Sequence, residues 1–513
     1  MLLQPLFDNA KARPTAKAVV DERGAITWGE LLKKAKKLGK ILRSKTKRPN
    51  IAVLLPAGGG FVTTFYATML AGKVVVPMNF LLGEKETRHV LKDSGVDLVV
   101  SVKPLLDRLD CGKAVKAAAE AGEVQVVDLL ALKPNLRAIL AQLRPLPSPK
   151  RAANDLAAIL YTSGTSGLPK GVRLTHGNLD SDAKACITHA RLDRIGHEHV
   201  FLGVVPLFHS TGLLATMLAP VQLGATTVYT QRFSPAGTIK AIREHGVTVM
   251  AAVPSMYNAI TRVKDAGPAD FAQMYAPISG GEPLPGRVRE SFRRRFDADL
   301  MEGYGLTETC GPICVNMPHA HRPGSVGQLI PGCDVLIIGD DGQAVGTGET
   351  GEIWIRGPMV FDGYHNLPEQ TGEAKTTEGY FKSGDLGHVD GDGYVFITGR
   401  AKDMLIVSGE NVYPREIEEA ITEMEAIDEA AVVGRPDESR GEVPVAFVIA
   451  AEGKQADEDT IKAFLRDEKN LPNFKVPREV RVVSDLPRSP TGKVLKRELA
   501  KQLQEPEPAE AAA

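Results

Sequence analysis

The chain has 513 residues, 43% hydrophobic and 24% charged, with a net charge of −1. This length predicts two or three compact units, and the composition excludes wholesale disorder. A net charge so close to zero gives no overall field that would attract nucleic acid or an anionic membrane, so we expect small-molecule partners. The N-terminal sequence from Met1 lacks a signal-peptide pattern, and no apolar run approaches the ~20 residues of a membrane span. We therefore expect a cytoplasmic protein.

The first half of the chain alternates helical and extended patterns. Apolar spacing predicts a helix over residues 28–42, and short buried strands are expected at 51–55, 74–77 and 96–100. Such alternation favours a layered α/β domain, which ends in a Pro-rich connector at 144–151.

The alternation continues over residues 155–330. Apolar runs predict further strands, at 156–161, 201–205, 226–229 and 247–253. Residues 332–398 are dense in Gly and Asp with short alternating runs, such as 352–355 and 393–397, which are typical of a small antiparallel or barrel-like unit.

The pattern changes again after Asp403. A compact α+β unit of about 110 residues is expected. Its predicted elements are helix 414–424, strands 430–433 and 445–449, helix 459–467 and strand 480–483. The last residues, from Gln504, have the composition of a disordered tail.

The five cysteines are scattered and do not predict a disulfide framework. Cys310 and Cys314, followed by His319 and His321, invite comparison with a zinc site. Structural zinc sites more often place their histidines three to five residues apart, whereas these two are separated by one residue. We therefore predict two partly buried thiols instead.

The stretch from Tyr161 to Gly171 predicts a phosphate-binding loop. A short apolar strand leads into Thr162, Ser163, Gly164, Thr165 and Ser166, and Lys170 follows. Glycines let backbone N–H groups approach an anion, hydroxyls add donors, and the lysine adds a positive charge. The common P-loop needs Gly-Lys-Ser/Thr in sequence, which this stretch lacks, so a kinase or P-loop ATPase is disfavoured.

Four further motifs carry candidate ligands. In the motif from Gly303 to Glu308, Tyr304 offers a flat face, Thr307 a donor and Glu308 a hard oxygen ligand suited to Mg²⁺. The other three motifs present Asp385 after a Gly turn, Arg400 with Lys402, and Lys493 after Pro-Thr-Gly. Each of these taken alone is as readily an ordinary turn or a solvated charge.

The order of the five motifs resembles the adenylate-forming superfamily of acyl-CoA synthetases, luciferases and peptide-synthetase adenylation domains. The similarity covers roughly residues 10–500 and is greatest to bacterial fatty acyl-CoA ligases. Smaller matches support it, at 207–212, 278–284 and 408–414.

The resemblance implies a large N-terminal domain (1–399) of layered α/β subdomains with a small barrel-like unit. A hinge (400–402), a small mobile α+β C-terminal lid domain (403–504) and a disordered tail (505–513) would follow. Rotation about Lys402 would bring first Lys493 and then the loop around Gly409 to the reaction centre.

The resemblance also implies a role for each candidate residue. Residues that would bind the nucleotide or line its pocket are Thr162, Ser163, Gly164, Thr165, Ser166, Lys170, Gly280, Gly281, Glu282, Glu302, Gly303, Tyr304, Asp385 and Arg400. Thr307 would contact the α-phosphate, Glu308 would hold Mg²⁺, and Lys493 would bridge the carboxylate substrate and the α-phosphate. His209 would belong with the catalytic residues, and Gly409 would shape the channel for the thiol of coenzyme A.

The implied reaction joins a carboxylic acid to ATP, releases pyrophosphate and passes the acyl group to a thiol. Amino-acid-activating relatives carry an Asp where this chain has His209, and malonate-activating relatives carry an Arg just before the Tyr-Gly motif, where it has Gly303. Fatty acids and aryl acids remain, and space beside Gly280 and Gly281 favours an alkyl chain. Acyl carrier protein stays open as the alternative acceptor. A catalytically inactive module is disfavoured, because all the key side chains are present.

Overall fold

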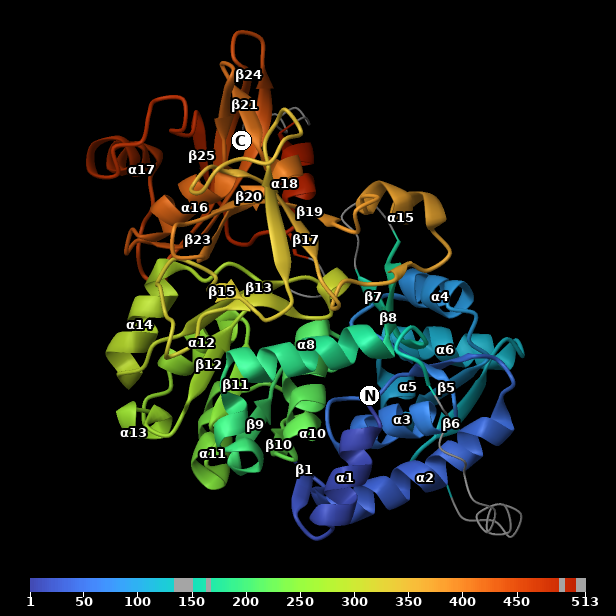
Figure 1. Cartoon of the computed structure of the whole chain (residues 1–513). Coiled ribbons are helices and arrows are strands. Elements are labelled where there is room, and N and C mark those ends of the chain that lie inside the picture. The colour runs from blue at the N-terminus through green and yellow to red at the C-terminus, as the bar shows by residue number, and fades with distance from the viewer. Residues whose placement is uncertain (133–150, 163–167, 489–493, 504–513) are drawn as a thin grey trace, which may run out of the picture. The chain divides into compact units, whose positions relative to one another are not determined.

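The computed structural model describes residues 1–132, 151–162, 168–488 and 494–503 (Figure 1). The fold is mixed α/β with several sheets, as the sequence predicts. The chain divides into two compact units. The first contains Met1–Leu284, Ser291–Val335 and Ile355–Phe381, and the second contains Pro285–Glu290, Leu336–Trp354 and the chain from Lys382 onward.

A seven-stranded sheet in the first unit carries the expected buried strands. Its order is β18-β8-β7-β4-β3-β5-β6. The strands are β3 (Asn50–Val53), β4 (Val74–Pro77), β5 (Leu98–Ser101), β6 (Gln125–Asp128), β7 (Leu156–Thr162), β8 (Lys170–Thr175) and β18 (Gly363–Tyr364). Strands β3 to β7 pair in parallel, whereas β8 is antiparallel to β7 and β18 is antiparallel to β8.

A nine-stranded sheet completes the β-structure of the first unit. Its order is β15-β14-β13-β12-β11-β9-β10-β1-β2. The strands are β1 (Lys17–Asp21), β2 (Gly24–Thr27), β9 (Val200–Gly203), β10 (Thr226–Tyr229), β11 (Val249–Ala252), β12 (Ala276–Ser279), β13 (Met301–Gly305), β14 (Pro312–Val315) and β15 (Gln328–Leu329). The first strands of the chain therefore belong to this sheet and not to the sheet of β3 to β6.

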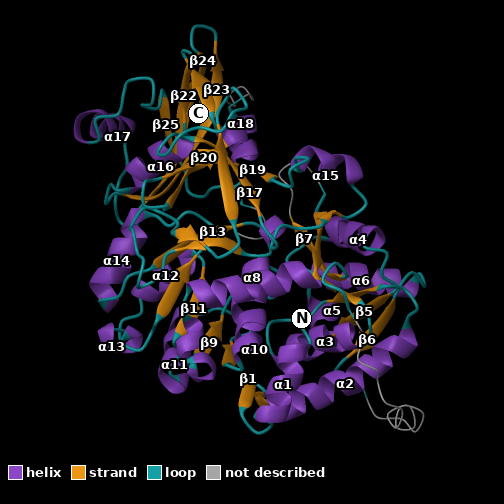
Figure 2. Ribbon diagram, viewed as in Figure 1, coloured by secondary structure: helices purple, strands orange, loops and turns teal. Residues whose placement is uncertain are grey.

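Helices cover both sheets. The longest of those in the described ranges, α2 (Trp28–Lys45), begins at a capping box of Thr27 and Glu30 and buries Trp28, Leu31 and Leu42 on one stripe. In Figure 2, strands β9 and β11 lie between two groups of helices, α11 with α12 and α8 with α10. The other α-helices in the described part of the chain before residue 400 are α1 (Gln4–Ala12), α3 (Gly59–Leu70), α4 (Glu84–Asp93), α5 (Lys103–Arg108), α6 (Asp110–Glu120), α8 (His176–His189), α9 (Ser210–Leu213), α10 (Ala219–Leu223), α11 (Pro235–His245), α12 (Pro254–Thr261), α13 (Pro268–Phe271), α14 (Gly286–Phe296) and α15 (Pro368–Ala374).

Two further sheets lie wholly or mostly in the second unit. One has four strands, in the order β16 (Asp334–Ile338), β17 (Gly351–Arg356), β19 (Phe381–Val389) and β20 (Val395–Arg400). The other has five, namely β21 (Leu405–Val407), β22 (Glu410–Val412), β23 (Ile427–Asp437), β24 (Gly441–Ala450) and β25 (Glu479–Val482). Its helices are α16 (Pro414–Thr422), α17 (Glu458–Ala463) and α18 (Lys496–Gln502), and Ile417, Ile421 and Ile461 pack into its core.

Within the described ranges, no helix is both long and apolar enough to cross a membrane.

Candidate active site

The predicted phosphate loop begins and ends on a strand pair. Thr162 closes β7 and Lys170 opens β8, and the two residues face each other across the antiparallel ladder. The Thr162 hydroxyl lies 3.5 Å from the Lys170 carbonyl oxygen. Ser163, Gly164, Thr165 and Ser166 lie outside the described residues. The hairpin therefore holds one hydroxyl and one cation at the base of the predicted loop, and both are groups that can bind a phosphate.

The motif from Gly303 to Glu308 lies on β13 and the turn that follows it. A side chain at Gly305 would meet the Gly311 carbonyl oxygen at 2.0 Å, so only glycine fits there. Thr307 and Glu308 lie in a one-turn 3₁₀ helix, η4 (Thr307–Thr309), and both are half-buried. The Thr309 hydroxyl fixes this turn by donating to the Gly311 carbonyl at 2.8 Å.

Tyr364, a residue that neither motif contains, connects Glu308 to Lys170 at the end of the predicted phosphate loop. The Tyr364 hydroxyl donates to Glu308 Oε1 at 2.9 Å, and Lys170 Nζ lies 5.5 Å from the centre of the Tyr364 ring. The structure thus brings together a cation and a carboxylate from distant parts of the sequence. No sequence motif considered above included Tyr364, and its two-residue strand is too short to show a period.

The loops expected around the adenine and acyl groups also meet. A Cβ at Gly280 would lie 3.2 Å from the Gly303 carbonyl oxygen, so the two loops approach closely. Glu302 is buried, and its Oε1 accepts a hydrogen bond from the Leu284 N–H at 3.1 Å. This bond fixes the segment that contains Gly281 and Glu282 against strand β13. Glu302 therefore has a structural role, because it holds the segment of Gly281 and Glu282 against β13. The sequence motif alone did not indicate this role.

His209 precedes the short helix α9. Its ring is half-buried and lies 4.7 Å from the Phe208 ring, which in turn packs edge-on against Phe80 at 4.9 Å. Gly212 permits the tight turn that follows, because a side chain there would meet the Pro206 carbonyl oxygen at 2.3 Å. The His209 ring therefore lies beside an aromatic pair, Phe208 and Phe80.

In the second unit, Asp385 and Arg400 face each other on β19 and β20. Arg400 Nε lies 2.9 Å from Asp385 Oδ1, and the aspartate is buried while the arginine side chain is 42% exposed. The arginine therefore orients the carboxylate that is predicted to accept the ribose hydroxyls.

The other predicted residues of the second unit lie in turns. Lys402 is exposed in the 3₁₀ turn η5 (Ala401–Asp403). Gly409 has a φ of 86°, which a glycine adopts without strain, in the turn between β21 and β22. Lys493 lies outside the described residues.

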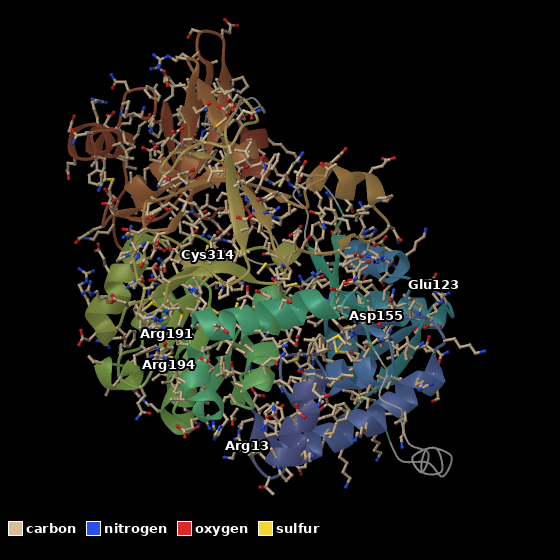
Figure 3. The ribbon with its side chains drawn as sticks, viewed as in Figure 1. Arg13, Glu123, Asp155, Arg191, Arg194 and Cys314 are labelled. Atoms are coloured by element: carbon tan, nitrogen blue, oxygen red, sulfur yellow. The ribbon has the colours of Figure 1, made fainter. Side chains whose placement is uncertain are left out.

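The two cysteines after the motif are buried thiols. Cys314 lies on β14 (Figure 3), and its Sγ is 4.0 Å from the Tyr304 carbonyl oxygen. Burial raises the pKa of both Cys310 and Cys314 well above its ordinary value. Both thiols therefore stay protonated and weakly nucleophilic at neutral pH.

Asp182 is a buried carboxyl that sequence reasoning missed. It lies on α8 and is fully buried, and its Oδ2 has no hydrogen-bond partner among the described residues. Cys186 Sγ lies 3.6 Å from its Oδ1, and burial raises the pKa of Asp182 well above its ordinary value. A side chain at Gly311 would meet Oδ2 at 2.8 Å, so this carboxyl packs directly beneath the turn that follows Glu308.

We expect the stability of the first unit to depend on the pH through Asp182. The folded state holds a proton that the unfolded chain releases near pH 3.9, so the contribution of Asp182 to stability is greatest below that pH and falls as the pH rises toward the raised folded-state pKa. Asp182→Asn removes this dependence. Its melting temperature should therefore rise relative to that of the wild type by roughly 1–2 °C for each unit of increase in pH. Thermal unfolding of both proteins between pH 5 and pH 8 measures the difference. Parallel curves would show that the carboxyl is already ionised in the fold.

The donor set of the first unit fits a nucleoside triphosphate with Mg²⁺. Thr162 and Lys170 supply a hydroxyl and a cation, Thr307 supplies a second hydroxyl, and Glu308 supplies a carboxylate. Phosphate oxygens accept from hydroxyls and lysine, and Mg²⁺ is usually bound through one or two carboxylates together with substrate phosphates.

Comparison with known proteins agrees with this chemistry. The family model of the AMP-binding enzymes matches residues 6–365, and that of the AMP-binding enzyme C-terminal domain matches residues 416–493. A long-chain-fatty-acid–CoA ligase of Bacillus subtilis is 32% identical over 98% of this chain and 94% of its own length. A feruloyl-CoA synthase of an Amycolatopsis species is 34% identical over 96% of this chain and 97% of its own.

The fold is shared with solved structures as well. O-succinylbenzoate coenzyme A synthetase (MenE) of Bacillus subtilis, in complex with ATP and magnesium ion, matches with a TM-score of 0.82 and 28% identity over 98% of this chain and 99% of that one. The chain therefore belongs to the AMP-binding enzyme family, as an AMP-forming acyl-CoA ligase.

Proposed function

We propose that this enzyme activates a medium- or long-chain fatty acid. A carboxylate oxygen of the acid attacks the α-phosphorus of ATP, the bond to the β-phosphate oxygen breaks, and pyrophosphate leaves. The thiol of coenzyme A then attacks the carbonyl carbon of the acyl-adenylate and releases its proton to solvent, the bond from that carbon to the phosphate oxygen breaks, and AMP leaves with the electron pair. The acid is already ionised at pH 7, so the first step needs no general base.

The space beside Gly281 is the observation that supports an alkyl substrate. A Cβ at Gly281 would meet only an apolar atom, Val253 Cγ1, at 3.8 Å. The neighbouring Gly303 has no cation for a second carboxylate, and His209 stands where an aspartate would pair with an amine. Open space that meets an apolar atom and no charged partner suits a methylene chain, which is recognised by its shape and its burial.

We assign the nucleotide to the residues of the predicted motifs. Thr162, Lys170 and the loop between them bind the β- and γ-phosphates, and Thr307 binds the α-phosphate. Glu308 holds Mg²⁺, which when bound neutralises charge on the phosphates. Asp385, oriented by Arg400, accepts the ribose hydroxyls.

The two steps need different groups at one centre. Lys493 serves the adenylation step, the loop around Gly409 serves the thiol step, and Lys402 is the hinge of the lid domain (403–504).

An aryl acid is the second candidate substrate. The similarity to a feruloyl-CoA synthase is as extensive as that to a fatty acid ligase. The aromatic pair Phe80 and Phe208 beside His209 offers a surface on which an aryl ring could stack.

Pyrophosphate release against a panel of acids separates the two substrates. Acids from acetate to oleate, with benzoate and ferulate, are each incubated with ATP and Mg²⁺, with and without coenzyme A. We expect the largest kcat/KM at a medium or long alkyl chain, because each buried methylene adds about 0.8 kcal/mol until the pocket is full. Thioester should form only when coenzyme A is added. A maximum at ferulate would show that the substrate is an aryl acid and not a fatty acid. Thioester formed on an added carrier protein but not on coenzyme A would show that the carrier protein is the acceptor.

A further inference from the structure

We propose that Tyr364 is a positioning residue that holds the Glu308 carboxylate for Mg²⁺ with its hydroxyl and supports Lys170 with its ring. The inference rests on the proposed function, which takes Glu308 as the metal ligand and Lys170 as a phosphate ligand. All three residues lie in the first unit.

Glu308 is fixed twice by one short segment. The Tyr364 hydroxyl donates to Glu308 Oε1 at 2.9 Å, and the Phe361 N–H donates to the Glu308 carbonyl oxygen at 2.7 Å. The side chain and the backbone of the glutamate are therefore both held. A carboxylate has about four lone-pair sites, so the tyrosine leaves sites for a metal. Holding the carboxylate in one orientation before Mg²⁺ arrives reduces the side-chain entropy lost on binding.

The pairing of strands β8 and β18 places Lys170 beside the same tyrosine. Strand β18 pairs with β8, so that Tyr364 stands opposite Val172 and the His365 N–H donates to the Gly171 carbonyl oxygen at 2.7 Å. Lys170 Nζ lies 5.5 Å from the centre of the Tyr364 ring, within the range of a cation–π contact. A Cβ at Gly171 would lie 3.0 Å from His365 Cβ, so a larger residue would press the two strands apart.

Tyr364 is itself well anchored. Its ring packs edge-on against the fully buried Phe361 at 4.9 Å, and its N–H donates to Thr371 Oγ1 at 2.9 Å. A rigid donor between a cation and a carboxylate can set the geometry of both.

The test is calorimetric binding of ATP without any carboxylic acid, so that no chemistry occurs. The dissociation constant is measured in Mg²⁺ and in EDTA, and the ratio of the two gives the magnesium-linked gain in affinity. Tyr364→Phe removes only the hydroxyl. We expect its magnesium-linked gain to fall roughly fivefold, while its affinity in EDTA stays within about twofold of the wild type.

A second variant separates the ring from the hydroxyl. Tyr364→Leu also removes the surface beneath Lys170, so it should weaken ATP binding in EDTA as well, by roughly threefold to fivefold. Tyr380→Phe is the matched control, since the Tyr380 hydroxyl donates to the Asp334 carboxylate at 2.6 Å, elsewhere in the same unit. This control should bind ATP like the wild type in both conditions.

Three outcomes would contradict the inference, and Glu308→Gln tells the first two apart. If Glu308→Gln lowers the magnesium-linked gain but Tyr364→Phe does not, the tyrosine does not position the carboxylate, and the proposed function stands. If Glu308→Gln also leaves the gain unchanged, Glu308 does not hold the metal, and both the inference and that part of the proposed function are wrong. Equal losses in Mg²⁺ and in EDTA for Tyr364→Phe would indicate a general structural role and would likewise overturn the inference.

Discussion

Replacement of Lys493 by alanine should slow formation of the acyl-adenylate by about 10²–10³-fold and spare the second half-reaction. In the first step, negative charge from the carboxylate and the triphosphate accumulates at the α-phosphorus, and a lysine ammonium there stabilises the transition state. Removal of one such preorganised charge slows a reaction by about 10²–10³-fold. The thiol attack on a supplied acyl-adenylate builds no such charge on the triphosphate, so its rate should stay within about twofold.

The two half-reactions are measured separately to make this comparison. Pyrophosphate release reports the first, and thioester formed from synthetic acyl-AMP and coenzyme A reports the second. Lys496→Ala is the control, because this neighbouring lysine pairs with Glu418 at 2.7 Å and has no assigned catalytic role. Equal loss of both half-reactions in Lys493→Ala would refute the role given to this lysine.

Glu308→Gln should produce the second large effect, in the magnesium dependence of adenylation. The substitution removes the charge and keeps the shape, and the amide oxygen can still accept from Tyr364. A neutral amide is a weak ligand for Mg²⁺, so kcat/KM for ATP should fall by about 10²-fold. Part of this loss should be recovered at high Mg²⁺ concentration.

A magnesium titration of pyrophosphate release gives the half-saturating metal concentration of each protein. Asp334→Asn is the control, since Asp334 is also a carboxylate that accepts from a tyrosine, Tyr380. An unchanged half-saturating concentration in Glu308→Gln would show that the metal is held elsewhere.

The sequence predicts most of the elements because buried strands and amphipathic helices leave strong patterns. The run 74–77 is apolar throughout and forms β4 with these same bounds, since a strand covered on both faces has no polar positions. The helix predicted over 28–42 is α2, which continues to Lys45. The helix predicted over 459–467 is also confirmed, as α17 followed by the π-turn η6 (Phe464–Glu468).

The choice of sheet for each strand could not be predicted from these patterns. Apolar runs show that a segment is a strand, but strand pairing depends on contacts between distant segments. Val19 of β1 pairs with Thr227 of β10, and so the N-terminal strands join the nine-stranded sheet. Strand β18 has only two residues, Gly363 and Tyr364, which no periodicity can reveal.

The candidate site was predicted residue by residue but not as a set of contacts. Lys170 and Glu308 stand out because loops rich in glycine present them. Their shared neighbour Tyr364 lies in a segment of mixed polarity, and only strand pairing places it between them. Asp182 could not be found either, because an aspartate on a helix is normally exposed.

The fate of the carboxylate oxygen tests the central claim most directly. Dodecanoate labelled with oxygen-18 in its carboxylate is incubated with the enzyme, ATP, Mg²⁺ and coenzyme A, and the nucleotide products are analysed by mass spectrometry. Because the carboxylate attacks the α-phosphorus and the thiol later breaks the carbonyl–oxygen bond, each AMP should carry one labelled oxygen, together with unlabelled pyrophosphate. Unlabelled AMP, or label in orthophosphate together with ADP, would contradict activation through an acyl-adenylate.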